Sequence, residues 1–207
     1  MNDKPTKNTA PLQLLLMVAI VLGTIVAGFL LFPDTQQERD ELLSELGTTN
    51  QGTFLIPPRP LDGLGPESAD GEPWRVAEHE RKWRLVIPGG ASCREQCREM
   101  VYRTRQVHKL LGRDTGRLER LYLSLDGTLE DETSAYFEKE HPYLDVVYAD
   151  RSAFATWAEN TNLGWQAGTI PALLVDPRGD AMMFYTPEHE GNQILEDLKH
   201  LLKYSPD

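Results

Sequence analysis

From residue 74 onward, the pattern of hydrophobic and polar positions alternates between strand and helix. Short apolar runs typical of strands lie at 83–87, 118–125, 144–148, 172–175 and 181–185. Segments with helical features lie between them, at 93–111, 130–140, 152–159 and 194–204. The order β-α-β-α-β-α-β-β-α predicts an α/β fold: a central mixed sheet with helices on both faces.

Residues 12–32 differ from this pattern because they contain no charged residue, and only Gln13 and Thr24 interrupt the apolar run. At ~1.5 Å per residue, such a helix reaches about 30 Å, the hydrocarbon thickness of a bilayer. A cleaved signal peptide is the alternative, but the run exceeds a usual signal core and ends without a small-residue cleavage site. The segment therefore predicts an uncleaved transmembrane helix.

The charges beside this segment indicate its orientation. Lys4 and Lys7 precede it, whereas the residues after it are mainly acidic. Positive flanks stay in the cytoplasm, so we expect residues 1–11 inside and the remaining chain outside. In a bacterium this describes a single-pass inner-membrane protein with a periplasmic domain, and a mitochondrial inner membrane fits the same argument.

Residues 33–72 have the composition of a tether. A short helix is expected at 38–46, and Pro57, Pro58, Pro60 and Pro66 then alternate with glycines, which favours extended chain. The stretch 54–58 is too apolar for a free linker and is expected to lie against the surface of the domain. The domain itself is expected at 73–207.

Composition removes several classes of function. The formal net charge of −11 disfavours nucleic acid as a partner, since phosphate binding needs a basic footprint. Two cysteines are too few for a disulfide scaffold or a four-thiolate zinc site. The chemistry of the chain therefore points to these two cysteines.

Cys93 and Cys97 are separated by three residues directly after a strand and a Gly-Gly loop. Ser92 and Glu95 have the form of a capping box, which makes Cys93 the first residue of a helix. The two α-carbons would then lie about 6 Å apart, within the range of a disulfide, in the positive field of the helix start. The pattern predicts a redox-active dithiol or a clamp for a soft metal. A structural disulfide is the alternative, although so short a loop restricts the unfolded chain little.

A second informative stretch is Ile170-Pro171, because proline is unusual at the entry of a strand. The loop-cysteine-helix start, this proline before a terminal hairpin, and the final amphipathic helix together resemble the thioredoxin superfamily. The resemblance implies that Pro171 follows a cis peptide bond and packs against the dithiol of Cys93 and Cys97.

Within that superfamily, three residues between the cysteines resemble the Sco/SenC proteins. These are membrane-anchored proteins that help to build the dinuclear copper centre of cytochrome c oxidase. The chain also resembles, over most of its length, thioredoxin-like proteins encoded beside oxidase genes in proteobacteria. The shared stretches are Gly47-Thr48-Thr49-Asn50-Gln51-Gly52, Leu55-Ile56-Pro57-Pro58, Arg105-Gln106-Val107 and Leu174-Val175-Asp176-Pro177-Arg178-Gly179. The resemblance implies an oxidase subunit or a copper-assembly protein as the partner.

The chain departs from the Sco pattern in its metal ligands. Sco proteins carry a copper-binding His just before the last hairpin, where this chain has Gly168-Thr169-Ile170-Pro171, and they usually have Pro where this chain has Arg94. Two thiolates still suit Cu(I). No other histidine replaces the missing ligand convincingly: His108 lies about 16 Å along the helix from Cys97, His189 follows the hairpin, and we expect the others at the surface or at helix ends, namely His79, His141 and His200.

For two methionines and three aromatic residues we expect structural roles. Met182 and Met183 are expected to place one side chain in the core and one outward, as neighbours in a strand do. Core positions or shelter for the cysteine loop are expected for three aromatic residues, Phe154, Trp157 and Trp165.

Three functional hypotheses remain open. The first is a membrane-anchored thiol-disulfide oxidoreductase that assists oxidase assembly, with Cys93 attacking, Cys97 resolving and Pro171 shaping the cleft. The second is a Cu(I) metallochaperone that uses the same cysteines and an unidentified third ligand. The third is a non-catalytic binding module in which the pair is a permanent disulfide.

Overall fold

The computed structural model describes residues 10–31 and 50–205. The chain divides into two compact units, Met1–Thr49 and Asn50–Asp207, each of which is described by itself. The first unit contains helix α1 (Ala10–Leu31), and all of its described side chains, 13–28, are exposed. Among the residues described, no helix has both the length and the apolar character needed to cross a membrane. The helix expected at 38–46 lies outside the described residues.

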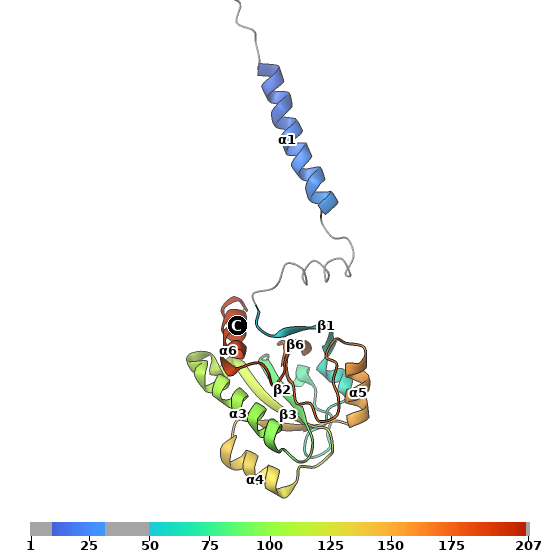
Figure 1. Ribbon diagram of the computed structural model, residues 1–207, viewed down its shortest axis with the longest axis vertical. Coiled ribbons are helices and arrows are strands. Elements are labelled where there is room, and N and C mark those ends of the chain that lie inside the picture. The colour runs from blue at the N-terminus through green and yellow to red at the C-terminus, as the bar shows by residue number, and fades with distance from the viewer. Residues whose placement is uncertain (1–9, 32–49, 206–207) are drawn as a thin grey trace, which may run out of the picture. The chain divides into compact units, whose positions relative to one another are not determined.

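The second unit is built on one six-stranded mixed sheet with the strand order β1-β6-β5-β2-β3-β4 (Figure 1). Strands β2, β3 and β4 run parallel, β5 is antiparallel to β2, and β6 pairs antiparallel with both β5 and β1. The strands are β1 (Thr53–Pro60), β2 (Trp83–Gly89), β3 (Leu118–Ser124), β4 (Asp145–Tyr148), β5 (Ala172–Val175) and β6 (Asp180–Tyr185).

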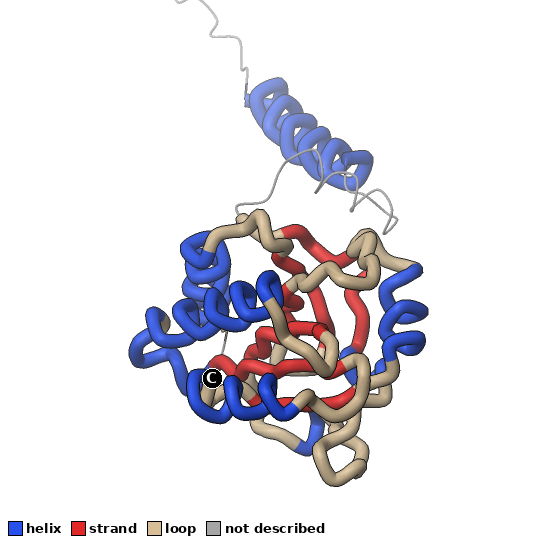
Figure 2. Tube along the Cα trace, turned by 60° about the horizontal axis from the view of Figure 1, so that its bottom comes forward, coloured by secondary structure: helices blue, strands red, loops and turns tan. Residues whose placement is uncertain are grey.

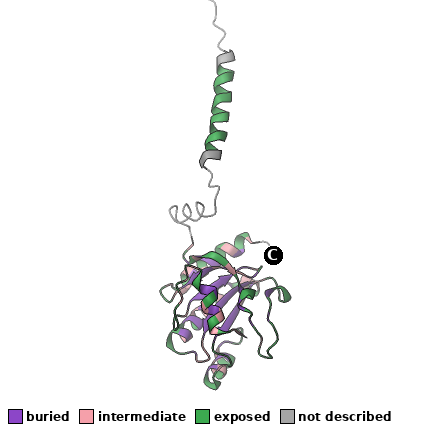
Figure 3. Ribbon diagram, turned by 90° about the vertical axis from the view of Figure 1, so that its right-hand side faces the viewer, coloured by how far each residue is buried: buried purple, intermediate pink, exposed green. Residues whose placement is uncertain are grey.

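Helices cover both faces of this sheet, as the sequence predicts (Figures 1 and 2). They are α3 (Glu95–Leu110), α4 (Asp131–Glu140), α5 (Arg151–Glu159) and α6 (Gly191–Tyr204). One core lies beneath α3, α4 and α6 and receives Leu85 and Ile87 of β2. The other lies beneath α5 and receives the intervening Val86. Alternate strand residues therefore serve opposite cores, and the central strands are buried throughout (Figure 3).

Local sequence explains where the helices begin and end. Asp150 begins α5 by accepting hydrogen bonds from the backbone N–H groups of Ser152 and Ala153. Glu190 and Gln193 form a reciprocal capping box at the start of α6. The four predicted helices all form, and their observed bounds lie within three residues of the expected ones.

Strand β1 corrects the expectation of a tether across 33–72. Leu55 is buried, and residues 53–60 pair with β6 at the edge of the sheet, where prolines are tolerated because no neighbour needs their missing N–H groups. The ladder is irregular between Phe54 and Arg59. There Asn162 takes the place of a neighbouring strand: its side chain accepts from Ile56 N at 2.8 Å and donates to Phe54 O at 3.0 Å. The domain therefore includes residues well before position 73.

Candidate functional site

Cys93 and Cys97 form a disulfide between β2 and α3, with an S–S distance of 1.97 Å. Their α-carbons are 5.1 Å apart, close to the separation expected from the sequence. Cys93 is 1% exposed and Cys97 is 4% exposed, so both residues belong to the core beneath α3. The disulfide is thus buried, and a reacting partner has to approach it through the surrounding loop.

Helix α3 begins two residues later than the sequence predicts. Its N-cap is Arg94, which has an extended backbone and no capping side chain, so Cys93 precedes the helix and Cys97 is its third residue. The expected cap, Ser92, instead accepts a hydrogen bond from Nε of Arg94 at 2.9 Å. The positive field of a helix start is confined to the first turn, and Cys97 lies in that turn.

Contacts from α4 hold the backbone of Cys93 in place. Thr133 Oγ1 accepts a hydrogen bond from the N–H of Cys93 at 3.1 Å. Arg98 donates from Nε to the carbonyl of Cys93 at 3.0 Å and from Nη2 to Glu132 at 2.7 Å. The Arg98 guanidinium also lies over the ring of Tyr136 at 4.7 Å. The loop that carries the disulfide is therefore fixed by two neighbouring helices.

Tyr122 of β3 places a polar side chain beside the disulfide. Its hydroxyl lies 3.5 Å from Sγ of Cys97 and donates to the carbonyl of Gly90 at 2.7 Å. Burial raises the pKa of Tyr122 well above its usual value, so the hydroxyl keeps its proton. Gly89 makes room for it, because a Cβ there would lie 2.2 Å from the hydroxyl oxygen. The small residues before Cys93 thus admit a buried hydroxyl beneath the sulfurs.

A pocket of about 270 Å³ borders Cys97 and opens between the cysteine loop and the loop before β5. Arg151 and Asp126 line it and form a bidentate ion pair at 2.7 and 2.6 Å. The hydrogen bond from Arg151 lowers the pKa of Asp126. Trp165 and Ile170 add apolar surface to the same pocket. The approach to the disulfide therefore combines a charged pair with an aromatic and an aliphatic side chain.

Pro171 is buried at the entry of β5, beside Ile170 of this pocket. The expected cis peptide bond is wrong: among the described residues the only cis bond joins Ile56 and Pro57, so Ile170–Pro171 is trans. Trans is the lower-energy isomer of an X–Pro bond by about 0.5–1 kcal/mol. A strand can also begin at proline in the trans form, since the first residue of a strand is one of the places that tolerate its missing N–H.

Among the described residues, no histidine forms a hydrogen bond with Cys93 or Cys97. His189 binds within its own turn, where its Nδ1 accepts from the N–H of Thr186 at 3.0 Å. His108 bonds through Nε2 to the carbonyl of Leu118 at 3.2 Å, and burial lowers its pKa. His141 directly follows the last residue of α4, which agrees with the expected helix-end position, and it is buried, at 1% exposed. In the part of the chain that is described, no group of three or more His, Cys, Asp or Glu side chains could hold a metal ion.

The aromatic expectations agree with the structure, and the expectation for the two methionines agrees in part. Met183 is 2% exposed, whereas Met182 is partly buried and packs against the same core instead of facing outward. Phe154 and Trp157 belong to the core beneath α5, and Trp165 borders the pocket beside Cys97. Tyr122 was not among the residues expected at the site. Its only signal is its place in the apolar run of β3, where the parallel register sets it beside Ile87 of β2 in the same core.

The family of the chain can now be stated. The family described as "Transmembrane-like, thioredoxin-like, C-terminal domain" matches residues 83–205, which include both cysteines and every strand except β1. The chain belongs to this family. No curated protein matches it.

Solved structures with a similar fold include several Sco proteins. Apo Sco1 from Thermus thermophilus is 19% identical with a TM-score of 0.54, over 75% of this chain and 99% of that one. Copper-bound yeast Sco1 is 13% identical with a TM-score of 0.55, over 77% and 97%. BsSco, a member of the Sco family of cytochrome c oxidase assembly proteins with a disulfide switch, is 14% identical with a TM-score of 0.51, over 75% and 98%. The chain thus has the thioredoxin-like fold of these proteins.

Proposed function

We propose that this protein exchanges disulfides with a partner through Cys93 and Cys97 and thereby assists the assembly of cytochrome c oxidase. The observation that carries the proposal is the Cys93–Cys97 disulfide at the junction of β2 and α3, beside a pocket lined by Arg151, Trp165 and Ile170. A disulfide at a strand-to-helix junction, next to an opening of mixed polarity, suits a reaction with the cysteines of another protein.

The proposed exchange has two steps, and each forms one disulfide bond and breaks another. In the reduced protein, the Cys93 thiolate attacks an oxidised partner, forms a mixed disulfide and releases one partner thiolate. The Cys97 thiolate then attacks Sγ of Cys93, which re-forms the Cys93–Cys97 disulfide and releases the partner as a dithiol. Because both residues are buried, the loop between Gly90 and Arg94 has to move to admit the partner.

The proposed reaction depends on thiolates, and two features of the loop would support them. Arg98 bonds to the carbonyl of Cys93, and the first turn of α3 places positive backbone dipoles near Cys97. Cations and helix starts lower the pKa of a cysteine and raise the fraction of reactive thiolate.

The oxidase as partner is supported by the resemblance of the sequence to proteins encoded beside oxidase genes, and by the Sco proteins among the similar structures. In the same proposal, residues 12–32 anchor the protein in the inner membrane, with the domain in the periplasm. The support is the lack of charge in this segment and the exposure of every side chain described at 13–28.

One observation favours a second function, a binding module with a permanent disulfide. Cys93 and Cys97 are 1% and 4% exposed, which is the burial expected of an inert structural bridge. The reduction potential separates the two functions: a value below about −300 mV is typical of structural disulfides, whereas exchange needs a higher one.

The test is an equilibrium redox titration of the full chain in a non-ionic detergent, followed by trapping. We expect a potential above that limit, and a mixed disulfide between the Cys97→Ser variant and an oxidised peptide that carries the paired cysteines of an oxidase subunit. The Cys93→Ser variant is the matched control and should trap nothing. A potential below the limit, or equal trapping by both variants, would overturn the proposal.

The same preparation tests the Cu(I) hypothesis. The described residues offer two thiolates and no third ligand, so copper delivery would depend on Cys93 and Cys97 alone. Copper retained by the reduced chain after desalting, and lost in the Cys93→Ser variant, would favour a metallochaperone. Exchange without any copper requirement favours the oxidoreductase.

A further inference from the structure

A second and larger pocket, of about 760 Å³, lies at the other end of the parallel strands. It is lined by the residues that enter β2 and β3, including Lys82 and Leu118, whereas the disulfide follows the last residue of β2. The seven residues of β2 separate the two ends by about 20 Å. Pockets of this volume are typical of small-molecule sites. No lining residue is shared with the pocket beside Cys97.

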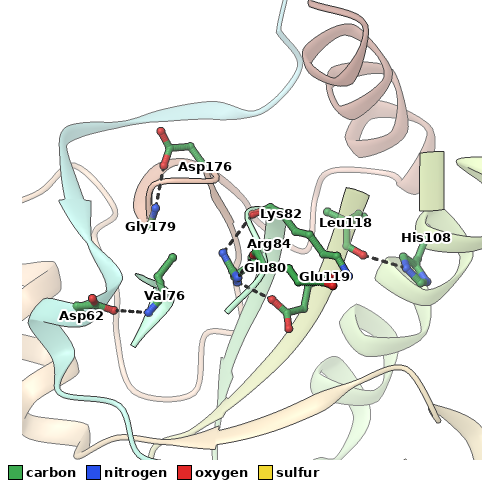
Figure 4. Close-up of polar contacts among 10 residues, drawn as sticks. All are labelled: Asp62, Val76, Glu80, Lys82, Arg84, His108, Leu118, Glu119, Asp176 and Gly179. Carbon is green, nitrogen blue, oxygen red and sulfur yellow. Dashed lines mark hydrogen bonds and ion pairs between the residues drawn. The ribbon is translucent and has the colours of Figure 1, made fainter. Parts of the chain in front are cut away.

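Cations outnumber acidic groups in this pocket, although the whole chain carries a net charge of −11. Four cationic side chains line it, Lys82, Arg105, Lys109 and Arg120, together with two carboxylates, Glu119 and Asp145. Figure 4 shows that Glu119 turns to Arg84, with which it pairs at 2.5 Å, so its charge is already neutralised within the domain. Lys82 likewise pairs with Glu80, which leaves Arg105, Lys109 and Arg120 against Asp145, so the charge left to a ligand is positive.

Arg120 is the centre of this cluster. It is 1% exposed, and its guanidinium donates only to neutral groups, the carbonyl of Val101 at 2.7 Å and the hydroxyl of Thr104 at 3.1 and 3.3 Å. Burial first, and then the charge of Arg105, lowers the pKa of Arg120 to about 10, so it remains charged at neutral pH. Within the described chain, no carboxylate pairs with Arg120 and no group accepts from its Nη1. A buried charge without a counterion is costly, and an anion in the pocket would relieve it.

His141, which also lines this pocket, has a polar atom without a hydrogen-bond partner. Its Nε2 lies 2.9 Å from the hydroxyl of Tyr136, while its buried Nδ1 has no hydrogen-bond partner among the described residues. Burial, together with Arg120, Arg105 and Lys109, lowers the pKa of His141 to about 4. The positive charges of these three residues are thus all felt at the His141 ring. The neutral ring can donate from Nδ1 when Nε2 accepts from Tyr136.

We infer that this pocket binds a compact, multiply charged oxyanion whose phosphate or carboxylate groups pair with Arg120, Arg105 and Lys109. The planar guanidinium of arginine matches both groups with paired hydrogen bonds. Lys109 is exposed and unpaired among the described residues, and Arg105 makes only a distant contact with Glu140, at 3.7 Å. Both side chains can therefore turn to a ligand at little cost to the fold.

The experiment is calorimetric titration of the full chain, in a non-ionic detergent at low salt, with inorganic pyrophosphate and separately with citrate. We expect saturable binding of one equivalent of at least one probe; pyrophosphate alone identifies a phosphoryl ligand and citrate alone a carboxylate one. Lys109→Gln should weaken binding about fivefold, the value of one charge pair at contact near water. The matched control is Lys199→Gln, which removes an exposed lysine of α6 outside the pocket and should change the affinity less than twofold.

Two further variants keep the inference falsifiable. Arg120→Met should abolish binding. If that variant fails to fold, Arg105→Gln serves in its place and should weaken binding severalfold. A Cys93→Ser, Cys97→Ser double variant should bind as the parent does, because the pocket is separate from the disulfide. Absence of saturable binding of both probes at millimolar concentration, or an equal loss in Lys109→Gln and Lys199→Gln, would overturn the inference.

Discussion

Replacing Tyr122 by Phe removes the hydroxyl that lies beside Sγ of Cys97 while keeping the ring. In the oxidised protein its proton goes to the carbonyl of Gly90 at 2.7 Å, and Sγ of Cys97, at 3.5 Å, gains little from it. After reduction, the thiol of Cys97 can donate to the same oxygen, so the reduced form has one more hydrogen bond. Such a bond contributes about 0.5–1.5 kcal/mol, which corresponds to roughly 10–30 mV for a two-electron couple. Tyr122→Phe should therefore lower the reduction potential by that amount.

The assay is equilibrium titration of the full chain against a glutathione or dithiothreitol buffer, with the two cysteines quantified by alkylation. Tyr148→Phe is the matched control, because the hydroxyl of Tyr148 makes no hydrogen bond within the described part of the chain, and its potential should equal that of the parent. An unchanged or raised potential in Tyr122→Phe would refute the argument, since it would mean that the hydroxyl does not favour the reduced form.

Three further predictions concern stability, and each is measured by urea unfolding of the full chain. Asp197→Ala should cost about 3–5 kcal/mol, because this buried carboxylate accepts from the backbone N–H of Gly52 at 2.8 Å and from two other donors. Gly89→Ala should cost about 1–3 kcal/mol by overpacking against Tyr122. His141, whose folded pKa of about 4 lies below its unfolded value, should make stability fall as the pH drops from 6.5 to 4, by up to about 1.4 kcal/mol per pH unit. His141→Phe should reduce this slope.

Each of these variants has a control in the same chain. Glu196→Ala removes an exposed carboxylate next to Asp197 and should change stability by less than about 0.5 kcal/mol. Gly116→Ala adds a methyl group where no atom lies within 4 Å and should not destabilise. His200→Phe, at an exposed position of α6, should keep the pH slope of the parent. Equal effects in a variant and its control would show that the named contact is not the cause.

The order of the elements after residue 74 could be predicted because each strand and helix carries its own periodic pattern. Apolar residues on alternate sides of β2 and β3 meet two different cores, and the apolar stripe of α6 includes Ile194, Leu198 and Leu202. Turn residues separate these segments. Pattern and packing therefore agree, which is the condition under which sequence specifies a fold.

Strand β1 escaped prediction because its pairing depends on residues far away in the chain. Prolines make residues 53–60 look like a linker, and the features that hold them lie more than a hundred residues later: Asn162, which bonds to Phe54 and Ile56, and Asp197, which bonds to Gln51 and Gly52. Propensity acts locally, whereas an edge strand is decided by its neighbours.

Two details near the candidate site, the first residue of α3 and the burial of His141, could not be predicted for the same reason. Ser92 and Glu95 have the spacing of a capping box, yet Ser92 bonds to Arg94 and the helix begins later. His141 follows α4 in a polar stretch, and only the packing of Tyr136 and Phe137 around it shows that it is buried. Side-chain partners chosen in three dimensions override the local signal in both cases.

Burial and anchoring together set what the disulfide can do. Thr133 and Arg98 hold the backbone of Cys93, and Tyr122 holds that of Gly90, so any partner that reaches the sulfurs first has to break three hydrogen bonds that the closed loop satisfies. A partner that presents its own extended backbone to this loop can replace those bonds, whereas a small thiol cannot. If the disulfide exchanges with a partner as proposed, we therefore expect a docked protein to react faster than glutathione, and we expect it to bind at the pocket with Arg151 and Trp165.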